Sequence, residues 1–455
     1  MLRVAGLLIA LIACISLGAQ AASLPAKANL CSACHGSQGQ GSDGLYPRLA
    51  GQPADYLYRQ LENFSNGARK NSVMAAIAGQ LTAGDMHSLA TYFSSLQVAF
   101  VPQTSAKLTV TELALGRELV TLGDWAHGVP ACASCHAPDL GGVAPQIPGL
   151  AGQPVQYLGA ALQRLKTSDD SNLAAATMQK VSRGLSADDI QAVAAYIGSL
   201  KAGEQPVVTR PVFDVDYHPV AQSPAAFTPP PLSAIPTGPD GDAIWQGLQL
   251  FKHTRALASD YVGNDLNCVN CHVDLGRQAG SAPMWAAYVA YPKYRSKNHK
   301  VNTLEERIQG CFRYSMNGKP PAADSAGMKA LVAYFHWLAT GLPVGITPKG
   351  AGYPKLPDPP EKASVERGAK VYAANCAICH ADNGEGRNVR HAQVFPPLWG
   401  PRSYNAGAGM SNIRMAAAFI HANMPYGRGR QLTLQEAWDV AAYMDGQPRP
   451  PDPRK

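Results

Sequence analysis

The sequence has few charged and few aromatic side chains and, beyond its first residues, no long hydrophobic run. Charged residues make up 16% and aromatic residues 7% of the 455 positions, while 46% are hydrophobic. This hydrophobic content is enough for real cores, which excludes disordered and fibrous chains. No later run approaches the roughly 20 apolar residues that span a bilayer, so no membrane span is predicted. The net charge of +7 comes with no nucleic-acid recognition motif, which makes nucleic acid a poor partner.

The first 21 residues have the features of a signal peptide. An apolar run over residues 4–18 follows Arg3, and Ala19-Gln20-Ala21 gives the small-x-small pattern before a cleavage site. We therefore expect a mature chain that begins at Ala22 and is exported to the periplasm. A lipoprotein anchor at Cys14 is the alternative, because residues 11–14 loosely resemble a lipobox.

Eight of the ten cysteines fall into four C-x-x-C-H motifs. These are Cys31-Ser-Ala-Cys34-His35, Cys132-Ala-Ser-Cys135-His136, Cys268-Val-Asn-Cys271-His272 and Cys376-Ala-Ile-Cys379-His380. Two thiols at this spacing add to the vinyl groups of haem, and the adjacent His ligates the iron, so the pattern predicts four covalently bound c-type haems. Zinc ribbons or disulfides are the alternative.

The first two motif segments form an internal repeat. Residues 47–53 recur as residues 148–154, at the offset of 101 that also separates Cys31 from Cys132. The second half adds two domains, in which amphipathic stretches before the motif and near the domain end predict an opening and a closing helix. We predict an all-α chain of four class I cytochrome c-type domains in two dihaem halves. The units are a signal peptide 1–21, domain 1 at 22–102, domain 2 at 103–200, a Pro-rich, semi-rigid linker 201–240, domain 3 at 241–346, a hinge 347–360 and domain 4 at 361–455.

A second axial ligand is needed on each haem, and methionines are candidates in three domains. Met74 lies 39 residues after His35, Met178 lies 42 after His136, and Met424 lies 44 after His380. Methionine sulfur suits an electron carrier because it raises the potential of the iron. The competing methionines are Met86, Met410, Met415 and Met444.

The third domain has a cysteine in the corresponding place. Cys311 lies 39 residues after His272, and it belongs to no C-x-x-C-H motif. A thiolate ligand there would lower the potential of the iron. The alternatives are ligation by Met316, which leaves Cys311 as a buried thiol, or a distal site that is open or holds His299.

Positive charge gathers near this cysteine. Residues 293–319 contain seven basic side chains against two acidic ones, so the excess charge of the chain is local to Cys311. A basic run can also be a solvated face.

With these residues in view, the second half resembles the thiosulfate dehydrogenases, which are periplasmic two-haem enzymes. The matching segments span about residues 240–450 and include residues 267–272, 281–285, 294–298 and 306–319. The first half resembles the tandem two-domain electron carriers of the cytochrome c-four family. The chain therefore resembles a fusion of an enzyme with its electron acceptor.

The resemblance implies which residues form the active site. It carries a His and Cys ligand pair onto His272 and Cys311, and substrate-site roles onto Arg307, Ser315, Arg295 and Lys297. Some members of the family place a Lys immediately before the distal Met of the second enzyme haem, where this chain has Asn423.

The implied reaction joins two thiosulfate ions to tetrathionate, reversibly, with release of two electrons. Arginine and lysine would offset the repulsion between two dianions, and Cys311 is a hypothetical nucleophile or transient covalent carrier. Electrons would pass from the third haem to the fourth, then to the second and first. The external acceptor would be a small cytochrome, a high-potential iron-sulfur protein or a terminal oxidase. The alternatives are a pure electron-transfer protein and another multihaem reductase or peroxidase.

Overall fold

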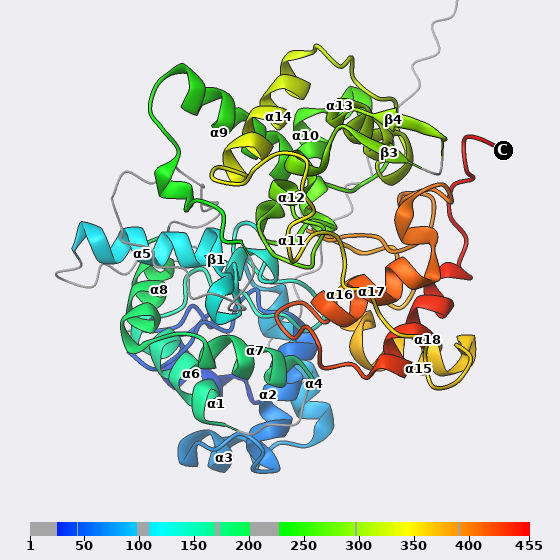
Figure 1. The fold of residues 1–455 in the computed structure, drawn as a ribbon. Coiled ribbons are helices and arrows are strands. Elements are labelled where there is room, and N and C mark those ends of the chain that lie inside the picture. The colour runs from blue at the N-terminus through cyan, green and yellow to red at the C-terminus, as the bar shows by residue number, and fades with distance from the viewer. Residues whose placement is uncertain are drawn as a thin grey trace, which may run out of the picture.

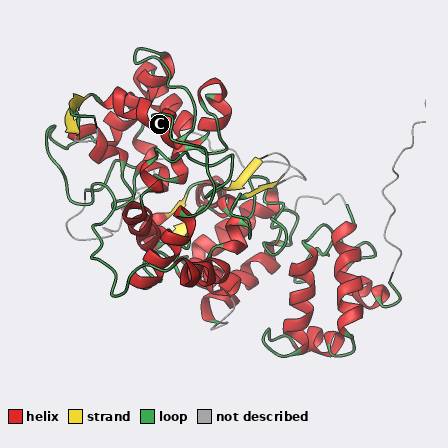
Figure 2. Cartoon of the chain, turned by 90° about the vertical axis from the view of Figure 1, so that its right-hand side faces the viewer, coloured by secondary structure: helices red, strands yellow, loops and turns green. Residues whose placement is uncertain are grey.

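The computed structural model describes residues 25–42, 44–97, 109–168, 173–200, 227–295, 298–389 and 392–455. Throughout these ranges the chain is built from helices joined by long loops, and its few strands are short (Figures 1 and 2). The all-α class and the cytochrome c-type domains expected from the sequence are confirmed. The predicted signal peptide, the lipobox and Lys297 lie outside the described residues.

The first half contains two four-helix units. The first unit consists of α1 (Ala28–His35), α2 (Ala54–Ser65), α3 (Ser72–Ala78) and α4 (Ala83–Ser95). The second unit consists of α5 (Val110–Thr121), β1 (Gly123–Asp124), η1 (Trp125–His127), β2 (Val129–Pro130), η2 (Cys132–Ser134), α6 (Val155–Thr167), α7 (Leu173–Arg183) and α8 (Ala187–Ser199). The strands β1 and β2 pair antiparallel, with Gly123 opposite Pro130.

The second half contains the third and fourth units. The third consists of η3 (Leu232–Ala234), α9 (Pro239–Lys252), α10 (Thr254–Leu257), η4 (Ser259–Tyr261), η5 (Cys268–Asn270), α11 (Val273–Gly276), α12 (Met284–Ala290), β3 (Lys293–Arg295), β4 (Lys300–Asn302), α13 (Leu304–Gly310), the π-helix η6 (Cys311–Ser315) and α14 (Ala326–Leu338). The fourth consists of α15 (Val365–Asn375), α16 (Ala377–His380), β5 (Arg387–Val389), β6 (Ala392–Phe395), η7 (Gly409–Ser411), α17 (Ile413–Asn423) and α18 (Leu434–Asp445). Each of the two strand pairs is an antiparallel hairpin.

The opening and closing helices cross at a glycine in three of the four units. A Cβ on Gly116, Gly247 or Gly368 would lie within about 2 Å of a carbonyl oxygen of the closing helix. Only glycine permits so close an approach of two helix backbones. The same kind of crossing therefore occurs in three helix pairs, α5 with α8, α9 with α14, and α15 with α18. The loops of these three units are thus attached to similar helix pairs.

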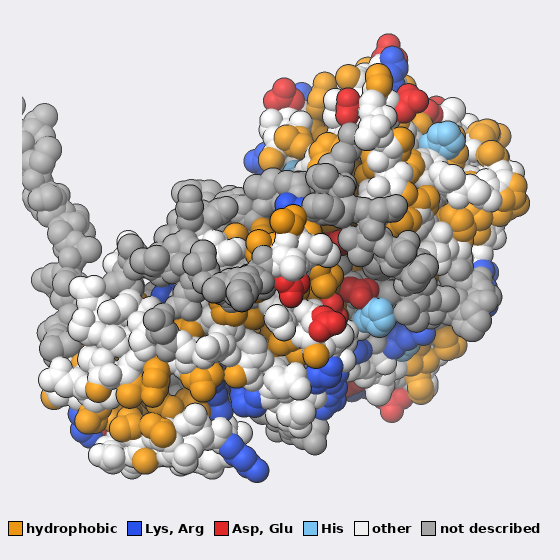
Figure 3. All heavy atoms as spheres, turned by 90° about the vertical axis from the view of Figure 1, so that its left-hand side faces the viewer, with side chains coloured by type: hydrophobic (Ala, Val, Ile, Leu, Met, Phe, Trp, Pro, Cys, Tyr) orange, Lys and Arg blue, Asp and Glu red, His pale blue; other side chains and the backbone are white. Residues whose placement is uncertain are grey.

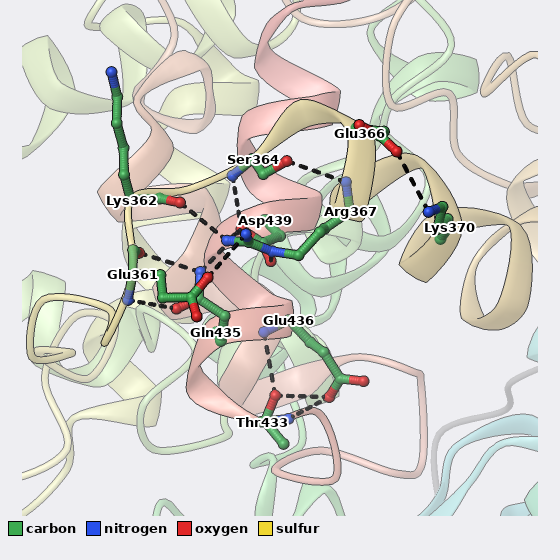
Figure 4. Close-up of polar contacts among 10 residues, drawn as sticks. All are labelled: Glu361, Lys362, Ser364, Glu366, Arg367, Lys370, Thr433, Gln435, Glu436 and Asp439. Atoms are coloured by element: carbon green, nitrogen blue, oxygen red, sulfur yellow. Dashed lines mark hydrogen bonds and ion pairs between the residues drawn. The ribbon is translucent and has the colours of Figure 1, made fainter.

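An ion pair also joins the opening and closing helices of the fourth unit (Figure 4). The side chain of Asp439, in α18, is only 2% exposed and accepts a 2.7 Å hydrogen bond from Arg367 Nε of α15. It also accepts a hydrogen bond from the backbone N–H of Ser364, the residue that caps α15. Burial alone would raise the pKa of Asp439, but these hydrogen bonds hold it below its usual value.

The parts of the expected linker and hinge that the structure describes pack against the third and fourth units, whereas residues 201–226 of the linker lie outside the described residues. Leu232 and Ile235 are buried in the core of the third unit, and Arg277 donates hydrogen bonds to the carbonyls of Pro229 and Pro230. In the hinge, Tyr353 packs against the core of the fourth unit. Proline and glycine predicted extended backbone, but composition could not show that its apolar side chains would be buried.

The described ranges contain no candidate membrane-spanning helix, and the face drawn in Figure 3 shows no continuous field of one charge. Over the described ranges, no helix combines the length and the hydrophobicity that a bilayer span requires. On the face drawn in Figure 3, basic and acidic side chains lie among hydrophobic and neutral ones.

Candidate active site

A hydrogen bond orients the ring of each of the four motif histidines in a way that suits metal ligation. The Nδ1 atoms of His35, His136, His272 and His380 each lie 2.7–2.8 Å from a backbone carbonyl oxygen. Since a carbonyl only accepts, Nδ1 carries the proton and the Nε2 lone pair stays available to iron. Burial lowers the pKa of His272 to about 4, which keeps its ring neutral as ligation requires.

The motif cysteines fit covalent haem attachment better than the alternatives. The nine cysteines of the described chain are all free and partly buried, so none forms a disulfide. Within those ranges, no three His, Cys, Asp or Glu side chains converge as they would around a metal ion bound by the protein alone, which argues against zinc. The residues present therefore fit c-type haem.

The first two units share one cavity of about 770 Å³. His35 and His136 line it together with the methionines that the sequence proposed as their partners, Met74 and Met178. The competing Met86 is instead buried in the core of the first unit. This arrangement is consistent with Met74 and Met178 as distal ligands.

In the fourth unit, Met424 lies at the end of α17, in the partly buried rim of the core. The preceding Asn423 is buried, and both its amide nitrogen and its amide oxygen form hydrogen bonds. Its Nδ2 donates to Phe419 O, and its Oδ1 accepts from Gln278 Nε2, both at 3.0 Å. These hydrogen bonds occupy the side chain of Asn423, which leaves Met424 as the candidate ligand at this position.

The third unit places an arginine against the proposed ligand Cys311. Arg307 Nη1 lies 3.0 Å from Cys311 Sγ, and the two residues are one helical turn apart at the junction of α13 with the π-helix. The charge that Cys311 carries when ionised raises the pKa of Arg307. The positive charge of Arg307 also disfavours protonation of His272, so cation, thiol and motif histidine belong to one site.

Cys311 is the first residue of the π-helix, a feature that no sequence pattern signalled. π-Turns are rare and occur mostly at functional sites, because the extra residue turns side chains away from their α-helical directions. Here the turn carries both Cys311 and Ser315, which is half-buried. The competing ligand Met316 follows it and is buried in the core of the third unit.

The remaining predicted substrate residues are only partly gathered at this site. Arg295 lies on β3 and donates a 2.9 Å hydrogen bond to the Tyr291 hydroxyl. Tyr291 also contributes to the raised pKa of Arg307. The predicted basic cluster is otherwise spread out. Lys293 and Lys300 lie on an exposed hairpin, and Lys300 forms a 2.7 Å ion pair with Glu306. Of the basic residues that the structure describes here, Arg307 is the one with a hydrogen bond to Cys311.

Tyr353 is a neighbour of this site that sequence reasoning missed. Its hydroxyl donates to the carbonyl oxygen of Cys271 at 3.3 Å, and its ring packs edge-on against Phe419 at 5.5 Å. Burial and the nearby sulfurs of Cys271 and Cys311 raise its pKa. Tyr353 thus bridges the third and fourth units from the segment expected to be a hinge.

The two halves meet where the second and fourth motifs lie close together. Cys135 and Cys379 flank one buried apolar cluster. Burial raises the pKa of Cys135, and the nearby Cys379 raises it further. Beside them, Trp125 of the first half packs edge-on against Tyr426 of the second at 4.9 Å. This contact brings the fourth motif next to the second.

Fold and site together define a multihaem c-type cytochrome. Models of the cytochrome c family match residues 23–97, 114–201 and 365–447, and the SoxA/TsdA cytochrome c domain matches residues 259–344. The chain therefore carries covalently bound c-type haem.

The relatives identify the particular family. Thiosulfate dehydrogenase of Thiomonas intermedia is 57% identical over 230 residues, which cover 50% of this chain and 73% of that protein. The thiosulfate dehydrogenase electron acceptor of the same organism is 38% identical over 179 residues, covering 39% of this chain and 82% of that protein. The chain belongs to the thiosulfate dehydrogenase family, with an electron-acceptor half ahead of the enzyme half.

A solved structure has the same overall arrangement. Thiosulfate dehydrogenase TsdBA from Marichromatium purpuratum, in its as-isolated form, aligns with a TM-score of 0.83 at 43% sequence identity. The alignment covers 93% of this chain and 88% of that one. The resemblance stated from the sequence, an oxidoreductase joined to its acceptor, is thereby confirmed.

Proposed function

We propose that this chain joins two thiosulfate ions to tetrathionate beside Cys311, and that the electrons leave through three further haem sites to an external acceptor. The contact that carries this proposal is the 3.0 Å pair of Arg307 and Cys311 next to the His272 motif. A bound c-type haem supplies acceptance and release of single electrons. His272 and Cys311 would hold it in the third unit, while a His and Met pair would do so in the other three.

The arginines give the site its preference for anions. The side chain of Arg307 is half-buried, and a cation in a partly dehydrated pocket offsets the repulsion between two dianions better than water does. Arg295, held by Tyr291, would extend this positive region. Ser315 would donate a hydrogen bond to a sulfonate oxygen.

Cys311 would act as the covalent carrier. A sulfur–sulfur bond would form between its thiolate and the outer sulfur of one thiosulfate, a two-electron oxidation for which bound haem would supply the electron acceptor. The outer sulfur of a second thiosulfate then attacks the sulfur bound to Cys311. This step forms tetrathionate and restores the thiolate, so no proton is gained or lost. The positive charge of Arg307 stabilises the thiolate as leaving group.

The contact between the halves supports an order of electron transfer. Because Cys135 and Cys379 share one cluster, the fourth site would reduce the second before the first. Since a thiolate-ligated iron has a lower potential than a methionine-ligated one, transfer from the third site is downhill.

The test compares thiosulfate-dependent reduction of an added acceptor by the wild type and by Cys311→Gly, both shown to retain four haems. We expect a loss of roughly 10³-fold or more, as for removal of a nucleophile. Met316→Leu is the matched control, because it removes the competing sulfur and should leave the rate unchanged. Equal rates for Cys311→Gly and wild type would refute the mechanism and favour a pure electron-transfer protein.

A further inference from the structure

The turn that carries Cys311 is held by residues outside it. The last carbonyl groups of a helix have no partner within the helix, and a buried carbonyl without a hydrogen bond is costly. The carbonyl oxygens of Arg313, Tyr314, Ser315 and Met316 all accept hydrogen bonds from other segments. The end of this π-helix is therefore capped completely.

Asn405, in a loop of the fourth unit, supplies half of the cap. Its Nδ2 donates to Arg313 O at 2.9 Å, and its backbone N–H donates to Tyr314 O at 3.2 Å. The residue is fully buried, and its Oδ1 accepts from Gly407 N at 3.0 Å, which fixes the orientation of the amide. One asparagine thus binds two consecutive carbonyls of the turn.

The third unit supplies the other half. Asn264 Nδ2 donates to Ser315 O at 2.8 Å, and Gly263 N donates to Met316 O at 2.9 Å. Asn264 Nδ2 also lies 3.2 Å from Ser403 O, two residues before Asn405. The two asparagines therefore tie the π-helix to the loop of the fourth unit from both sides.

The geometry points to Asn405 as a positioning residue for Cys311. A π-helix is intrinsically unfavourable and persists where its surroundings determine it. Asn405 fixes the backbone of the turn, the turn fixes the direction of the thiol, and the fourth unit thereby completes the site of the third. This inference rests on the proposed role of Cys311 and adds a part of the site that lies in another haem unit.

The test uses the full-length haem protein with Asn405→Asp. The carboxylate keeps the acceptor for Gly407 N but removes the donor to Arg313 O and places an oxygen against that carbonyl. Asn405→Ser, which is neutral and smaller, serves if the aspartate variant fails to fold. The matched control is Asn412→Asp, because the Asn412 side chain caps α17 only through its oxygen.

Three measurements are made on each variant. They are the hydrogen exchange of residues 311–318, the electron paramagnetic resonance signal of a thiolate-ligated haem, and kcat and KM separately. We expect faster exchange, a weakened or shifted thiolate signal and a roughly 10-fold lower kcat with little change in KM, since loss of a residue that orients a metal ligand typically costs 10- to 100-fold in activity.

The outcomes separate this inference from the proposed function. A wild-type thiolate signal and kcat in both Asn405 variants would overturn it, even if hydrogen exchange rises, because the cap would then be structural only. If Cys311→Gly abolishes activity while Asn405→Asp changes neither the thiolate signal nor kcat, only the proposed role of Asn405 is refuted. If Cys311→Gly is fully active, the proposed function falls and this inference with it.

Discussion

The third and fourth units share a frame but differ in what their loops place beside the motif histidine. In both, a glycine lets the opening helix cross the closing helix, and the histidine Nδ1 donates to a backbone carbonyl. The fourth unit then offers Met424 at the end of a regular helix, whereas the third offers Cys311 on a π-helix beside Arg307. The helical frame is shared, and on the proposed ligation the segment between the motif and the closing helix would decide the chemistry of the haem.

The largest change would come from giving the third unit the candidate ligand of the fourth. Cys311→Met should lower thiosulfate oxidation by roughly 10³-fold. It should also raise the potential of that haem, because a neutral thioether donates less charge than a thiolate. Potentiometric titration of all four haems measures the second effect. A variant that keeps both activity and potential would show that Cys311 is not what distinguishes the two units.

Removing the cation should have the next largest effect. Arg307→Gln should reduce kcat/KM for thiosulfate by about 10- to 100-fold, mainly through KM, because it deletes a hydrogen bond to charged partners. Arg313→Gln is the matched control, since Arg313 lies on the same turn but is exposed. Steady-state kinetics at low and high salt would distinguish them. Equal losses in both variants would mean that only the overall charge matters.

The fourth unit should depend on the ion pair that its buried Asp439 forms with Arg367. Arg367→Leu leaves the Asp439 carboxylate buried without its cation. We expect the melting temperature of the fourth unit to fall by roughly 3–5 °C. Lys370→Leu is the control, because the Lys370 and Glu366 pair of the same helix is exposed (Figure 4). The folded pKa of Asp439 is lowered, so its contribution is present above the unfolded pKa and is lost as the pH falls through the folded pKa. The difference between variant and wild type should therefore shrink below about pH 4.

The smallest effect concerns the contact between the halves. Trp125→Ala removes an edge-on aromatic pair worth about 1 kcal/mol, so reduction of the first-half haems should slow by roughly 5-fold. Reduction of the enzyme-half haems by thiosulfate should stay at its wild-type rate. Val110→Ala, an exposed side chain of α5, is the control. Stopped-flow spectroscopy separates the two phases, and an unchanged slow phase would remove Trp125 from the junction.

The sequence predicted the frame better than the site. Motif spacing and the 101-residue offset gave the haem motifs and the helical units, because those features are local or periodic. The spacing from His272 also singled out Cys311 as a candidate ligand, whereas the role of Arg307 came from resemblance. The π-helix, Tyr353 and Asn405 were missed. Each of the last three depends on a contact between units that lie far apart in the chain, and no local pattern encodes such a contact. Charge counting also could not show that Lys300 forms an ion pair with Glu306.

The junction of Cys135 and Cys379 also bears on kinetics. When an enzyme and its acceptor are separate molecules, they must first collide, and the rate depends on their concentrations and on salt. Here the two motifs already lie in one buried cluster within a single chain. The effective concentration of acceptor at the enzyme is therefore fixed by the fold. Internal transfer should be a first-order process that does not change on dilution, and only the exit to the external acceptor should retain a dependence on encounter.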